Sequence, residues 1–156
     1  AAMPDSIRER IAQNIASTME GIRMVNGFDV DVQRVLRARV PGVKVQEFPT
    51  ILVVERSETK EQPSTPGGLL GKWSCALTVA LVCGVRNDEM AREANLLLAN
   101  VEKALLAELP RGGLAVLTDL VGNEIFVTED LEGTKAGITV VIEVRYRHAD
   151  QDPFVP

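Results

Sequence analysis

Residues 73–86 constrain the fold more than any other part of the sequence, because their side chains alternate in size over the whole segment. The odd positions are Trp73, Cys75, Leu77, Val79, Leu81, Cys83 and Val85, and the even positions are Ser74, Ala76, Thr78, Ala80, Val82 and Gly84. A repeat of two residues with large apolar side chains on one side predicts a β-strand. At strand rise this segment spans about 46 Å, whereas a globule of 156 residues is only about 39 Å across. We therefore expect the strand to bend, with Gly84 as a candidate position, or to project past the body.

Two other segments carry apolar residues at helical spacing. The first covers about residues 6–23 and opens with a capping-box pattern formed by Ser6 and Glu9. The second covers about residues 88–109, with residues 87–89 as its cap and Pro110 at its end. Both should form long amphipathic helices.

Four further segments have strand patterns. Residues 28–32 alternate apolar and acidic side chains, and residues 48–56 contain an apolar run typical of a buried strand. Residues 123–129 and 138–147 should pair as a hairpin through a loop at 130–137. Successive strands without helices between them favour an α+β fold. We expect one domain over residues 1–156, with a mixed, mainly antiparallel sheet of about four to five strands and two long helices packed on one face.

Residues 57–72 interrupt this pattern. They are rich in serine, threonine, proline, glycine and charged residues, and they show no periodicity before Leu69. Long segments of this kind inside a domain are usually functional loops or disordered ones. We expect a flexible polar loop that becomes ordered when it contacts a partner.

Charge and motif content argue against several function classes. The net charge is -5, which disfavours sequence-specific binding to nucleic acid, and the chain has no run of 18 apolar residues that would favour a membrane span. The glycines before Lys72 have the wrong spacing for a phosphate loop. His148 is the single histidine, expected at the surface, and Cys75 and Cys83 are too far apart on one strand to pair. We therefore expect no metal site, no cofactor and no enzymatic activity.

Charge is also segregated along the chain. Basic residues gather at Arg34, Arg37, Arg39 and Lys44, and acidic residues at Asp119, Glu124, Glu129, Asp130 and Glu132. Opposite patches on one chain suit a head-to-tail contact that closes a ring, although the same charges could be neutralised within one subunit. The small-residue side of the strand at 73–86 should likewise pack on the second helix or on a neighbouring subunit.

The order of elements resembles the tail terminator proteins of long-tailed bacteriophages over nearly the whole chain. The resemblance rests on the helix at 7–22, the Phe48-Pro49-Thr50-Ile51 strand with the polar loop after it, and the strand ending at Arg86 before the Leu97-containing helix. It continues through Gly137-Ile138-Thr139-Val140, Val144-Arg145-Tyr146-Arg147 and the Asp152-Pro153-Phe154 end.

The resemblance implies a structural role without catalytic residues. Such proteins form a ring, typically a hexamer, which caps the head-proximal end of the tail tube, stops tube polymerisation and offers a surface for joining the head. The implied partners are further copies of the chain, the tail tube protein and a neck or head-completion protein, in the virion tail and, during assembly, in the host cytoplasm. The expected interface residues are Arg34, Arg37, Arg39, Lys44, Lys60, Lys72, Arg145 and Arg147.

Two alternatives remain at this point. One is a head–tail connector of similar fold, which would differ in its binding partner. The other, from a different class, is a small cytoplasmic ligand-binding domain or enzyme with a site near residues 67–72.

Overall fold

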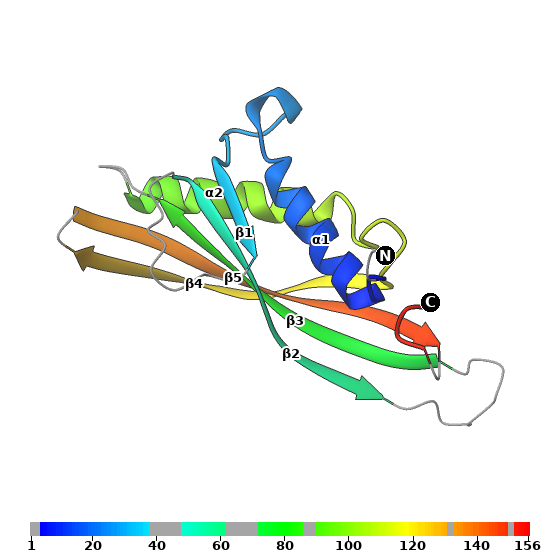
Figure 1. Ribbon diagram of the computed structural model, residues 1–156. Helices are drawn as coiled ribbons and strands as arrows, with labels where there is room; N and C mark the ends of the chain where they lie inside the picture. The colour runs from blue at the N-terminus through cyan, green and yellow to red at the C-terminus, as the bar shows by residue number, and fades with distance from the viewer. Residues whose placement is uncertain (1–3, 38–47, 62–71, 86–89, 131–132, 150–151) are drawn as a thin grey trace.

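The computed structural model describes residues 4–37, 48–61, 72–85, 90–130, 133–149 and 152–156. In these ranges the fold is α+β, with two α-helices and a five-stranded mixed sheet, in broad agreement with the sequence-based expectation (Figure 1). The elements in chain order are α1 (Ile7–Glu20), the 3-10 helix η1 (Met24–Asn26), β1 (Arg34–Arg37), β2 (Thr50–Glu61), β3 (Lys72–Val85), α2 (Met90–Leu106), β4 (Leu117–Asp130) and β5 (Gly133–Ala149).

The strands lie in the order β1-β2-β3-β5-β4. β1 runs parallel to β2, and the three other neighbouring pairs are antiparallel. β4 and β5 form the predicted hairpin, but both strands are longer than expected, so that the predicted loop at 130–137 belongs almost entirely to strands. This order makes β1 and β4 the two edge strands of the sheet.

The first helix forms where its capping signal predicted. The Ser6 hydroxyl oxygen accepts a hydrogen bond from the Glu9 backbone N–H at 3.1 Å, which satisfies one of the free donors of the first turn. Ile7, Ile11 and Ile15 face inward and are buried. The helix ends at Glu20, three residues earlier than expected, because the chain turns at Gly21.

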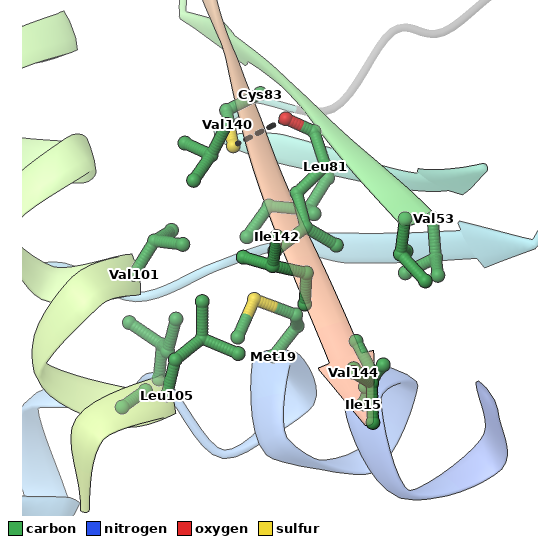
Figure 2. Close-up of a cluster of buried hydrophobic side chains, with 14 of the residues drawn as sticks. Ile15, Met19, Val53, Leu81, Cys83, Val101, Leu105, Val140, Ile142 and Val144 are labelled. Atoms are coloured by element: carbon green, nitrogen blue, oxygen red, sulfur yellow. Dashed lines mark hydrogen bonds between the residues drawn. The ribbon is translucent and has the colours of Figure 1, made fainter. Parts of the chain in front are cut away.

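One side of the sheet, which we call the core face, carries the odd positions of β3 and the even positions of β5. Buried side chains of both helices join it in a single hydrophobic cluster. Figure 2 shows Met19 of α1 and Leu105 of α2 beside Ile142 of β5. α1 contacts β1 and β2, whereas α2 contacts β3 and β5. Each buried aliphatic side chain contributes about 1.5–3 kcal/mol, and a one-residue slip would turn all of them away from the cluster, so burial fixes the register.

The prediction of one long strand at residues 73–86 is confirmed, since β3 covers Lys72–Val85. Figure 1 shows the strands extending past both helices. The predicted strand at residues 28–32 is wrong, although Val30 and Val32 are buried as its alternation required. The Val32 N–H donates a hydrogen bond to the Ile22 carbonyl oxygen at 2.9 Å and not to a neighbouring strand. Strand pairing in this part of the chain begins only with β1.

The predicted loop at 57–72 is also wrong at both ends. Residues 58–61 continue β2 and pair with residues 74–77 of β3, after a bulge between Glu55 and Glu58. Lys72 already belongs to β3. The remaining part, residues 62–71, lies outside the described residues, as does the cap predicted for α2 at 87–89.

Candidate protein interface

The two edge strands differ in length and exposure. β4 has 14 residues, and in the described structure its only strand partner is β5. Its residues 121–125 are all exposed, including Val121 at 62% and Ile125 at 51% of their full surface. Lysine and proline, which often protect an edge from pairing, are both missing from the β4 sequence. β4 is therefore an edge on which another strand can add, with a bulge at Val121 as its one irregularity.

The two edges carry opposite charge. β1 contains Arg34 and Arg37 and no acid, whereas β4 contains four carboxylates and no base. The four are Asp119, Glu124, Glu129 and Asp130. Because the strand order puts β1 and β4 on opposite sides of the sheet, the charge segregation of the sequence becomes a segregation between two surfaces.

Arg37 is bound within its own chain. Its guanidinium lies 2.5 Å from Glu9 on α1 and 2.9 Å from Glu55 on β2. The hydrogen bond to Glu9 is the main cause that raises the pKa of Arg37, and it also lowers the pKa of Glu9. Arg37 therefore ties α1 to the edge of the sheet, so it is a poor candidate for the predicted intersubunit contact.

Arg34 differs from Arg37 in its surroundings. Its side chain is exposed, and it forms no ion pair with any residue that the structure describes. In the strand register Arg34 lies level with Thr50, one residue out of phase with Val35 and Arg37, which face the core side. Arg34 therefore projects from the opposite side of the sheet.

We call that opposite side the small-residue face, after Ala76, Thr78, Ala80 and Val82 of β3. Val54 of β2 and Val141 of β5 flank Ala80 in the register. The inward side chains of α2 join the odd positions of β3 on the core face. Of the two alternatives for the small residues, packing on the second helix is therefore wrong, and packing on a neighbouring subunit stays a prediction.

Three other predicted interface residues project from the small-residue face, near the end of β5. Arg145 lies 2.9 Å from Glu143 and 3.6 Å from Asp119, whereas Arg147 and Lys72 are exposed. Arg145 donates a hydrogen bond to Glu143, and this bond raises the pKa of Arg145. The basic residues thus fall into two groups that the sheet does not bring together, and Arg39 and Lys44 lie outside the described residues.

Lys60 belongs to a polar cluster on the core face. Its ammonium lies 3.2 Å from Nε2 of His148 and 3.9 Å from Glu58, which also accepts a hydrogen bond from the Tyr146 hydroxyl. His148 stacks on Trp73 and is only 4% exposed. The expectation of a surface histidine is therefore wrong. The even positions of β5 are buried, and His148 is the last of them. The alternation in the sequence could therefore have predicted its burial.

The described residues contain no cluster of three or more His, Cys, Asp or Glu side chains arranged to hold a metal ion. Both cysteines are buried and free, as expected, and burial raises the pKa of the Cys83 thiol to about 12, which keeps it protonated and unreactive. Within the same ranges, neither helix has the length and apolar content that crossing a membrane requires.

Comparison of the chain with protein-family models and with curated protein sequences finds no match.

Proposed function

We propose that this chain is a structural subunit of a phage tail, a tail terminator that forms a ring on the head-proximal end of the tail tube. The observation that carries the proposal is the opposite charge of exposed Arg34 on the β1 edge and exposed Glu124 on the β4 edge. A patch that is complementary to another patch elsewhere on the same molecule gives a head-to-tail contact, and repetition of that contact closes a ring when the rotation permits.

The remaining surfaces support the same assignment. We propose that both helices cover the core face, so that the small-residue face is left for contacts with the tube or the head. Arg147 and Lys72 are exposed on that face and can bind an acidic partner surface. The resemblance to tail terminators gives the ring its size, typically six copies, and its partners, the tail tube protein and a neck or head-completion protein.

Removal of the protein from its source particle tests this assignment. A terminator stops tube growth, so electron microscopy of particles lacking the chain should show overlong tubes or tails that fail to join heads. Complementation with the unmodified chain is the matched control and should restore tails of uniform length. Normal, correctly terminated tails in the absence of the protein would exclude a terminator role. Tubes of normal length that fail to join heads would move the chain to the head–tail connectors.

A further inference from the structure

We propose that β4 of one copy pairs with β1 of the next, so that the sheet continues from subunit to subunit around the ring. This inference deepens the proposed function and rests on its ring of identical copies. It specifies the contact as an antiparallel strand pairing, with Arg34 and Glu124 as its charged pair.

Strand direction permits this pairing. β1 is parallel to β2, and each following step across the sheet to β3, β5 and β4 reverses direction. β1 and β4 therefore run in opposite directions within one chain. A head-to-tail repeat about an axis close to the strand direction keeps this relation, so β4 meets the next β1 as an antiparallel partner, whose backbone groups can form a regular ladder.

β1 and β4 also occupy the same height along the strand direction, as the residue pairs across the sheet show. The register aligns Leu36 with Leu52, then with Val82 and Thr139, and finally with Glu124. Arg34 is aligned in the same way, through Thr50, Gly84 and Gly137, with Phe126. Arg34 and Glu124 thus stand two residues apart along the strand direction, at opposite edges of the same level of the sheet.

Both charged side chains project from the same face. Glu124 is paired with Thr139 and Arg34 with Thr50, and both pairs belong to the small-residue face. Across a new β4–β1 ladder they become diagonal neighbours, about 7–8 Å apart at their Cα atoms and within reach of long side chains. Glu124 is exposed and, like Arg34, has no ion pair with the described residues.

On the core face, the same ladder brings apolar side chains together. Ile125 pairs with Ile138 in its own hairpin, and Val35 pairs with Ile51. In the level alignment, Val35 of one copy stands opposite Ile125 of its neighbour. The pairing therefore covers Ile125, which is 51% exposed in the single chain.

A charge exchange tests the pairing. In the proposed contact, Arg34→Glu places a second carboxylate beside Glu124, and Glu124→Arg places a second guanidinium beside Arg34. Each variant alone should fail to form rings, because like charges meet at every contact. An equimolar mixture should form rings in which the two variants alternate. Glu20→Arg, an equal charge reversal at the exposed end of α1 and outside both edge strands, should still form rings.

Ring formation is measured by electron microscopy with and without tail tubes, and circular dichroism checks that each variant is folded. Rings from either variant alone, or a mixture that stays unassembled while the unmodified chain forms rings, would overturn the strand pairing and leave the terminator role intact. Failure of the unmodified chain to form rings in both conditions would overturn the ring itself. Leu36 of one copy stands directly opposite Glu124 of the next in this alignment, at a distance that a disulfide can bridge. Disulfide formation between copies carrying Leu36→Cys and Glu124→Cys in assembled rings would support the pairing directly, and its absence would contradict it.

Discussion

Gly137 is a residue whose identity the packing of the sheet dictates. A β-carbon at this position would overlap the ring of Phe126 and lie 2.6 Å from the carbonyl oxygen of Cys83. The carbonyl belongs to the backbone of β3 and cannot move without disturbing the ladder. A glycine in a strand usually weakens it, but here it allows close approach of β5 to its neighbours.

We expect Gly137→Ala to lower the free energy of unfolding by about 2 kcal/mol or more, because overpacking against backbone cannot be relieved by a side-chain rotation. Gly122→Ala is the matched control, since nothing lies within 4 Å of its β-carbon position. It should leave the stability unchanged or raise it by up to about 1 kcal/mol. Urea denaturation measures both. Equal effects of the two substitutions would contradict the packing described at Gly137.

Arg111 is buried, although its neighbours in the sequence predict an exposed turn. It is fully buried, and its guanidinium donates hydrogen bonds to the carbonyl oxygens of Leu105 and Glu108 at the end of α2. A positive charge at a helix C-terminus is favourable because it offsets the helix dipole. In the sequence Arg111 stands between Pro110 and Gly112, a context that is typical of an exposed turn. Its burial therefore could not be predicted from the sequence.

At the scale of elements, one arginine joins three pieces of structure. Arg37 of β1 binds Glu9 of α1 and Glu55 of β2. The bond to Arg37 holds the pKa of Glu9 below its ordinary value of 4.5. A carboxyl whose pKa is lower in the folded state than in the unfolded state stabilises the fold above the unfolded pKa. That contribution disappears as the pH falls through the folded pKa.

Glu9→Gln should therefore lower the free energy of unfolding at neutral pH, by up to about 1 kcal/mol for a partly exposed ion pair. The difference from the unmodified chain should stay constant down to about pH 5 and shrink at lower pH. Denaturation curves across this range measure it. Glu20→Gln on the same helix, where no described arginine is bound, should lose no stability at any pH. A Glu9→Gln deficit that persists into acid would show that the carboxylate charge is not the cause.

The alternation of side chains was enough to predict the core elements. β3, β5 and α1 follow it because burial of one face decides both their existence and their orientation. The polar end of β2 could not be predicted, since its side chains find partners such as Tyr146 and Lys60 only in the folded sheet. For the candidate interface, the charges were visible in the sequence, but their placement at opposite edges depends on strand order. The separation of Arg34 from Arg37 depends on the register.

At the scale of the whole molecule, the sheet defines the assembly surfaces. Buried side chains of both helices share one cluster with the odd positions of β3 and the even positions of β5, and the two edge strands differ in charged residues. The structure also refines which arginine to alter. Reversal of Arg37 would break the ties of α1 and β2 to the edge, so its effect on assembly could not be separated from its effect on folding. Arg34 has no such tie to any residue that the structure describes.

Binding to assembled tail tubes from the source system would test the terminator role itself. The chain should co-sediment with the tubes, and electron microscopy should show a ring at one end of each tube. No binding to tubes, with binding instead to isolated head portals, would place the chain on the connector side of the neck. Binding to neither would contradict a role at the tail terminus.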